Sequence, residues 1–285
     1  MNRSGFANRT FMLGLAAVTT LSAACATTPG SQPNLDATLW VQTAPEYAAV
    51  SRSVYRAAAR DLSTLMWDSA TSAALEQAGD FSSLPPAVIV DVDETVLDNS
   101  PYQARLLITD QPYNSDTWAA WVDERSAAPV PGALEFAETA ARLGITVFYV
   151  TNRRNSQEAA TRANLLALGF PVREDLDVVL TRDERPEWSR AKSSRRAVVA
   201  STHRVVILVG DDLNDFVDVE GLTITEREAI AEEYGKYWGT RWRMLPNPTY
   251  GSWERALYGS DYGLTLSERT DRKAKSLEPK GNTDE

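Results

Sequence analysis

The chain has 285 residues, of which 43% are hydrophobic and 24% charged, and its formal net charge is −10. This length accommodates one good-sized core with an accessory element, or two small domains. The acidic balance argues against a nucleic-acid polymer as partner, because proteins that bind one present a basic face. With one Cys and one His, the chain can form no intramolecular disulfide and no zinc site built from several His or Cys ligands.

The same scarcity excludes two kinds of hydrolase. Cys25 is followed by Ala-Thr-Thr-Pro-Gly-Ser, which lacks the arginine-terminated phosphate loop that a cysteine-based phosphatase needs. A Ser-His-Asp triad would have to use His203. That residue stands just before the apolar run 205–209 and is expected to be structural or solvated.

The N-terminal segment has the pattern of an export signal. Residues 1–24 place two arginines before a short apolar stretch and then small residues, and the apolar stretch is too short to span a membrane. Cys25 resembles the lipid-bearing cysteine of a bacterial lipobox, with Leu21 four residues before it rather than three. We expect a lipid-anchored protein of the cell envelope, at the outer membrane or on the periplasmic face. The alternative is ordinary cleavage near Ala24, giving a periplasmic or secreted protein.

A flexible tether and then a helix follow the export signal. Residues 25–35 are rich in Thr, Pro, Gly and Ser, which is typical of a linker. The next segment carries apolar residues at three- and four-residue steps, which predicts a helix packed on the domain. These residues are Tyr47, Val50, Val54, Ala58, Leu62 and Leu65.

Residues 36–266 are expected to form one α/β domain. Short β-branched runs occur at 87–92, 145–150, 176–180 and 204–209, with helical stretches at 132–143, 156–168 and 188–200 between them. This alternation predicts a parallel sheet with helices on both faces, to which the first helix forms an N-terminal extension. Residues 98–130 interrupt the rhythm and are predicted to form a small helical cap. Residues 267–285 are almost without apolar side chains and are expected to be disordered.

Three of the predicted strands end in polar residues. Asp91 and Asp93 follow the first strand, Thr151-Asn-Arg-Arg154 the second, and Gly210-Asp-Asp-Leu-Asn-Asp215 the last. Ligands of open parallel sheets bind outside the carboxyl ends of the strands. Carboxylates gathered there would repel one another unless a hard cation such as Mg²⁺ lay among them. One such segment could be a simple turn or helix cap, but three of the same character indicate a site.

These segments resemble the haloacid dehalogenase (HAD) superfamily. Asp91-x-Asp-x-Thr95 is similar to its first signature, Thr151 to the second, Lys192 to the third and Gly210-Asp-Asp-x-x-Asp215 to the fourth. The longer segments 91–102, 148–153, 210–216 and 245–251 are similar to the lipoprotein e(P4) group of bacterial acid phosphatases and 5′-nucleotidases. This resemblance covers roughly residues 40–260 and implies a HAD-like, Rossmann-type fold.

The resemblance implies roles that fit the chemistry of each residue. Asp91 would attack phosphorus and form an aspartyl-phosphate. Asp93 would protonate the leaving group and later accept a proton from water, so it must carry a proton when substrate arrives; neighbouring carboxylates favour that form, which indicates an acidic optimum. Mg²⁺ would be held by the Asp91 carboxylate, the Asp93 backbone carbonyl and Asp211.

The resemblance also implies residues that bind the phosphoryl group, residues that orient other side chains and residues that contact the leaving group. Thr151, the Asn152 backbone N–H and Lys192 would hold the phosphoryl oxygens, the alternative for Lys192 being a solvated residue of a basic helix. Asp212 and Asp215 would orient ligands, waters or Lys192. Arg153 and Arg154 are left open between surface charge and substrate contact. Trp118 and Tyr250 are the candidates for stacking on a nucleobase, with plain packing as the alternative.

We therefore predict an exported, Mg²⁺-dependent acid phosphatase that acts on small phosphomonoesters, with nucleoside monophosphates as the favoured class. Two alternatives stay open. One keeps the site but acts on sugar phosphates or transfers the phosphoryl group to another alcohol. The other is a non-enzymatic surface lipoprotein that binds ligands, although a retired site would need neither Asp91 nor Asp93. Oligomeric state is left open, a homo-oligomer included.

Overall fold

The computed structural model describes residues 34–261 and 263–278. The predicted export signal (1–24), Cys25 and all but the last two residues of the tether (25–35) lie outside these ranges. Within them, no helix is both long enough and apolar enough to cross a bilayer.

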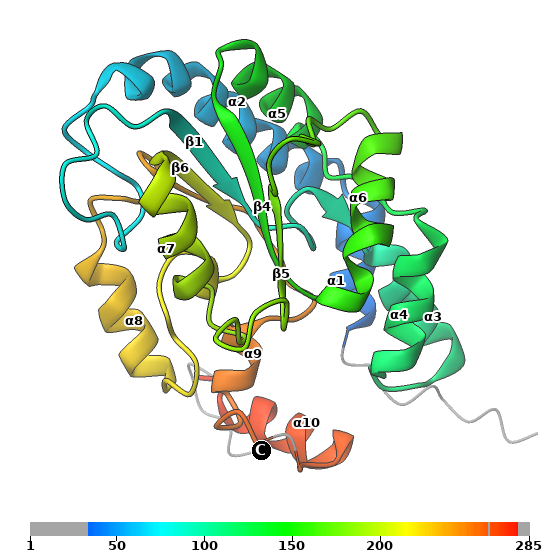
Figure 1. Ribbon diagram of the computed structural model, residues 1–285. Helices are drawn as coiled ribbons and strands as arrows, with labels where there is room; N and C mark the ends of the chain where they lie inside the picture. The colour runs from blue at the N-terminus through cyan, green and yellow to red at the C-terminus, as the bar shows by residue number, and fades with distance from the viewer. Residues whose placement is uncertain (1–33, 262, 279–285) are drawn as a thin grey trace, which may run out of the picture. The chain divides into compact units, whose positions relative to one another are not determined.

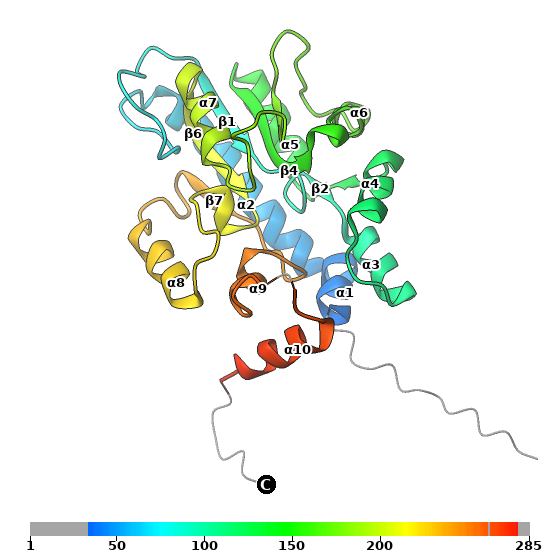
Figure 2. The ribbon, with the colours of Figure 1, turned by 60° about the horizontal axis from the view of Figure 1, so that its bottom comes forward.

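The described chain begins with the predicted helical extension. Helix α1 (Leu35–Thr43) is followed by α2 (Pro45–Trp67), which starts with Pro at a position where a missing N–H costs nothing. The side of α2 that carries Tyr55, Ala58 and Leu62 is buried. It packs against α5 (Ala133–Arg142) and the central sheet, while α1 lies against α3 (Ser100–Thr109) (Figure 2).

A five-stranded parallel sheet forms the centre of the domain, which confirms the predicted fold class (Figure 1). Its strand order is β5-β4-β1-β6-β7. The strands are β1 (Pro86–Val90), β4 (Thr146–Arg154), β5 (Val179–Arg182), β6 (Arg204–Gly210) and β7 (Trp242–Met244). Strands β1 and β6 are almost wholly buried, as expected for a sheet covered on both faces.

Helices cover both faces of this sheet. Helices α2 and α5 lie on one face and α7 (Ser193–Thr202) on the other, while α6 (Glu158–Ala167) contacts the edge strand β5 (Figure 1). The other elements of this region are short or peripheral. They are the 3₁₀ turns η1 (Asn155–Gln157) and η2 (Leu213–Asp215) and the helices α8 (Ile224–Glu233) and α9 (Ser252–Ala256).

The segment predicted as a cap is a small helical insertion. Strands β2 (Leu97–Asp98) and β3 (Ala128–Pro129) pair antiparallel at its base. Helices α3 and α4 (Ser115–Glu124) lie between them in the sequence and project beside the sheet (Figure 2). Asn114 caps α4 by accepting hydrogen bonds from two backbone N–H groups.

The expectation of a disordered C-terminal tail is wrong for residues 266–275, which form α10 (Leu266–Lys275). Thr265 and Glu268 form a capping box at its start. Three basic residues occupy its last turn, where positive charge interacts favourably with the negative end of the helix dipole. Lys273 pairs with Glu254 of α9. Local capping and charge therefore stabilise a helix that apolar periodicity does not reveal.

Candidate active site

The site begins where β1 ends. The backbone N–H of Asp91 still bonds to the Val209 carbonyl of β6 at 2.9 Å, so the carboxylate emerges beside the end of that neighbouring strand. The chain then turns sharply: Glu94 has a positive φ of 59°, a conformation that costs energy for a residue other than Gly. The Tyr55 hydroxyl of α2 donates a hydrogen bond to the Thr95 carbonyl at 2.6 Å and thereby stabilises the turn.

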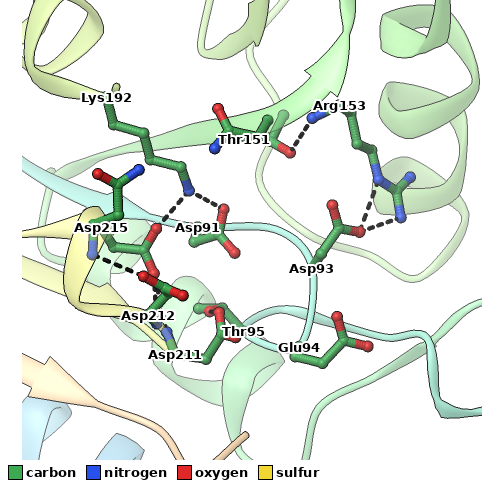
Figure 3. A network of polar contacts seen from close by, with 12 residues as sticks. Asp91, Asp93, Glu94, Thr95, Thr151, Arg153, Lys192, Asp211, Asp212 and Asp215 are labelled. Atoms are coloured by element: carbon green, nitrogen blue, oxygen red, sulfur yellow. Dashed lines mark hydrogen bonds and ion pairs between the residues drawn. The ribbon is translucent and has the colours of Figure 1, made fainter. Parts of the chain in front are cut away.

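Three carboxylates converge at this edge of the sheet. Oxygens of Asp91, Asp211 and Asp215 all lie within 4.8 Å of one another (Figure 3). Burial raises the pKa of Asp91 to about 7, despite the nearby Lys192 charge. Burial also raises the pKa of Asp211 well above its usual range, and the charges of Asp215 and Asp91 add to this effect. A cluster that resists ionisation in this way fits a hard divalent cation with oxygen ligands.

Lys192 brings positive charge into the carboxylate cluster. Its side chain is buried and donates to Asp215 at 2.6 Å and to Asp91 (Figure 3). Burial alone would lower the pKa of Lys192, but the Asp215 and Asp91 carboxylates outweigh it, so the pKa is raised and the amine stays charged. The solvated alternative for this residue therefore does not hold.

Asp215 supports the site by bonding on both sides. One carboxylate oxygen accepts from Lys192, and the other accepts from the backbone N–H groups of Asp211 and Asp212 at 3.1 and 3.0 Å. This approach requires Gly210, because a Cβ there would lie 2.2 Å from the Asp215 oxygen. Asp215 therefore holds Lys192 and the backbone of Asp211 and Asp212 in place.

Asp211 and Asp212 have different surroundings. The two oxygens of Asp211 accept from the Thr95 hydroxyl at 3.0 Å and from the Asn247 amide at 2.8 Å, which fixes its orientation toward Asp91. The Asp212 carboxylate instead accepts hydrogen bonds from the backbone N–H and the hydroxyl of Ser252, at the start of α9. Asp212 therefore attaches the C-terminal segment to the site.

The carboxyl end of β4 carries Thr151 and Asn152, the residues predicted to contact phosphate. The Thr151 hydroxyl accepts the backbone N–H of Arg153 at 3.0 Å. The Asn152 side chain is held between Arg195, at 2.8 Å, and the Arg190 carbonyl, at 3.1 Å. Arg195 also donates to the Thr151 carbonyl and to carbonyls of the loop before Lys192. This buried arginine thus joins the two segments that would hold phosphate.

Asp93 points away from the three-carboxylate cluster. Its Oδ1 atom accepts from Arg153 Nε at 2.9 Å and forms an ion pair with Arg153 Nη2 at 2.8 Å (Figure 3). The same oxygen also accepts from Asn99 Nδ2 at 2.9 Å. Of the two possibilities that the sequence left open for Arg153, surface charge is therefore wrong, because the side chain is buried against Asp93. Both Arg153 and Asn99 are almost fully buried.

The two predicted stacking residues contact the neighbours of Asp93. Trp118 of the cap packs edge-on against Tyr102. The guanidinium carbon of Arg153 lies over the Trp118 ring, 5.6 Å from the ring centre. The Tyr250 hydroxyl donates to Glu94. Trp118 therefore contacts Arg153, which pairs with Asp93, and Tyr250 contacts Glu94, which follows Asp93 in the chain. Among the described residues, the structure shows no direct contact between the Trp118 and Tyr250 rings.

Sequence reasoning did not assign functions to Asn99, Arg153, Arg195 or Asn247. Asn99 and Asn247 lie inside the segments that carry the family resemblance, so their position in those motifs was an available signal. Arg153 also lies in such a segment, 148–153, whereas Arg195 lies in none. The contacts of both arginines depend on burial against residues more than 40 positions away in the chain.

Comparisons with known proteins agree with this geometry. Residues 13–253 match the family described as HAD superfamily, subfamily IIIB (acid phosphatase). The chain belongs to this family. The class C acid phosphatase from Bacillus anthracis is 31% identical, with a TM-score of 0.75 over 86% of this chain and 97% of that one. A structure of the Bacillus anthracis enzyme with tungstate bound gives 30% identity and a TM-score of 0.73. The resemblance stated from sequence is thereby confirmed.

Curated plant relatives match over a shorter stretch. Acid phosphatase 1 of Solanum lycopersicum is 28% identical over 163 residues, which are 57% of each chain. The stem 28 kDa glycoprotein of Glycine max is 25% identical over 166 residues. The chain thus spans a little over half the length of these two relatives, 57% and 58%.

Proposed function

We propose that this HAD subfamily IIIB protein is a Mg²⁺-dependent acid phosphatase that hydrolyses small phosphomonoesters, 5′-nucleotides among them, through an aspartyl-phosphate on Asp91. One observation carries the proposal. The buried Asp91 carboxylate is in contact with Lys192 and close to Asp211, at the carboxyl edge of the sheet, where Thr151 lies in the last part of β4. A nucleophile, positive charge and hydroxyl donors thus meet at one point.

The donor set fits a magnesium ion. The Asp91 and Asp211 carboxylates and the backbone carbonyl of Asp93 would hold it, and their all-oxygen character matches the preference of Mg²⁺. When bound, the ion would offset the negative charge of the phosphoryl group. The raised pKa values of Asp91 and Asp211 support this assignment, because such carboxylates need a cation to ionise together.

The protein's own residues would carry the reaction in two displacements. An Asp91 oxygen forms a bond to phosphorus while the bond to the leaving oxygen breaks, and that oxygen takes a proton from Asp93. Water then attacks the same phosphorus and gives a proton to Asp93, and the Asp91–phosphorus bond breaks to release phosphate. Thr151, the Asn152 N–H and Lys192 hold the phosphoryl oxygens during both steps.

The substrate class rests on two further observations. The related Bacillus anthracis enzyme binds tungstate, a tetrahedral oxyanion like phosphate. Trp118 and Tyr250 lie near Asp93, where the leaving group must be when it receives its proton. Aromatic rings at that place favour a leaving group with a flat ring, such as a nucleoside.

A phosphate-release assay tests the proposal. Nucleoside monophosphates, sugar phosphates and p-nitrophenyl phosphate are compared with Mg²⁺ and with EDTA. We expect metal-dependent turnover that Asp91→Asn abolishes and that the matched exposed variant Asp271→Asn leaves intact. Absence of metal-dependent turnover of every substrate would refute the enzyme assignment. Sugar phosphates turned over faster than nucleotides would instead favour the alternative substrate class.

A second comparison tests the stacking residues. Trp118→Ala should reduce kcat/KM for adenosine monophosphate more than for glycerol phosphate, because both release an alcohol but one has a base to stack. Equal losses on the two substrates would make Trp118 a packing residue.

We also propose that the protein is exported and anchored through lipid on Cys25, as the N-terminal sequence pattern indicates. Mass spectrometry of the membrane fraction tests this proposal, since an unmodified mature terminus would exclude the anchor. Sedimentation velocity would decide whether the protein forms a homo-oligomer.

A further inference from the structure

We propose that Arg153 is a positioning residue for the proton donor Asp93, and that it couples this donor to the cap through Trp118. The inference rests on the proposed function, in which Asp93 protonates the leaving oxygen. It assigns a task to a buried arginine to which the reaction scheme above gives none.

The hydrogen bonds of the Asp93 carboxylate converge on one of its two oxygens. Arg153 Nε and Asn99 Nδ2 both donate to Oδ1 at 2.9 Å, and Arg153 Nη2 forms an ion pair with the same oxygen at 2.8 Å. Among the described residues, none is hydrogen-bonded to Oδ2, and that oxygen carries no dashed line in Figure 3. An oxygen whose two lone pairs already accept N–H groups, and which lies against the Arg153 cation, has no room for a proton of its own. The transferable proton must therefore reside on Oδ2.

Arg153 is itself held in place by several neighbours. Its side chain is 1% exposed, and its Nη1 atom donates to the Thr161 hydroxyl of α6 at 3.1 Å. Its Nη2 atom also reaches Oδ1 of Asn99 at 3.3 Å, and the same oxygen accepts Trp121 Nε1 at 2.8 Å. The guanidinium is thus fixed from the sheet, α6 and the cap, which gives Asp93 one defined orientation.

Arg153 also links Asp93 to the cap. The guanidinium carbon lies 5.6 Å from the centre of the Trp118 ring, within the range of a cation–π contact. Trp118 is also the ring proposed to contact the leaving group. Arg153 therefore contacts both the ring proposed to hold the leaving group, Trp118, and the acid proposed to protonate that group, Asp93.

The test separates proton donation from binding. A series of ring-substituted phenyl phosphates differs in the basicity of the leaving group but hardly in size. Because kcat/KM reports the step that expels the leaving group, poor leaving groups need the proton from Asp93 and p-nitrophenolate does not. The native enzyme hydrolysing the series establishes the proposed function, and only the slope of log(kcat/KM) against leaving-group pKa tests this inference.

For Arg153→Gln we expect kcat/KM for phenyl phosphate to fall roughly 10²-fold, the lower end of what general acid catalysis supplies, and that for p-nitrophenyl phosphate to change only a few-fold. Arg153→Lys should recover part of the loss, because an ammonium can still donate to Oδ1. Arg204→Gln is the matched control: this buried arginine bonds backbone carbonyls at the opposite end of β6 and should leave the slope unchanged.

If Arg153→Gln does not fold, Thr161→Val decides the question, because it removes one support of the guanidinium and nearly preserves side-chain shape. It should steepen the slope by a smaller amount. Parallel lines for the native enzyme and a folded variant, with equal losses on all leaving groups, would overturn the inference and make Arg153 a binding or packing residue.

Discussion

Replacement of Asp91 by Asn tests the electrostatic account of the site through stability, independently of catalysis. In the metal-free protein the pKa of Asp91 is about 7, against 3.8 for a free carboxyl. At about 1.4 kcal/mol for each pKa unit, this difference corresponds to about 4 kcal/mol. Because the folded-state pKa is the higher one, the stabilising effect is fully present below pH 4 and is lost as the pH rises through 7.

The experiment is urea unfolding in EDTA between pH 4 and pH 8. At pH 8 we expect Asp91→Asn to be more stable than the native protein by up to about 4 kcal/mol, since a neutral amide replaces a buried carboxylate. At pH 4 the two proteins should be equally stable. The exposed variant Asp271→Asn controls for the change of charge.

Two results bear on the reasoning directly. If Asp91→Asn is less stable than the native protein at pH 8, attraction to Lys192 exceeds the cost of burying the Asp91 carboxylate. That result would refute the conclusion that the ionised carboxylate destabilises the metal-free site. Addition of Mg²⁺ at pH 8 should stabilise the native protein and not the variant, because binding to the folded state alone raises the free energy of unfolding.

Three further predictions concern other parts of the fold. Gly210→Ala should lower the melting temperature and abolish turnover, since its Cβ would displace Asp215; normal activity would contradict this. Burial lowers the pKa of His203, so the native protein should lose stability relative to His203→Gln as the pH falls below about 6.5, and parallel curves in urea unfolding would refute the idea. Glu76→Ala should cost about 3 kcal/mol in urea unfolding by leaving the buried Arg196 without its carboxylate partner, with kcat unchanged; an unchanged unfolding midpoint would argue against it.

The sequence alone determined the fold class and the chemistry of the strand ends. Apolar β-branched runs spaced by helical stretches have few ways to bury themselves other than a parallel sheet, so four of the five strands of the main sheet were predictable. The strand β7 (Trp242–Met244) was not, because its three residues are too few to form a pattern. The acids Asp91, Asp93 and Asp211 stood out because a buried strand has no other use for them.

The tertiary structure decided what each acid contacts. Asp93 and Asp91 are two residues apart in the chain, yet one is held by Arg153 from the next strand and the other by Lys192 from the start of α7. Sequence spacing cannot distinguish these surroundings, since a partner 60 or 101 residues away is brought close only by the packing of the sheet. The burial of the two basic residues, and hence their strength as partners, follows from the same packing.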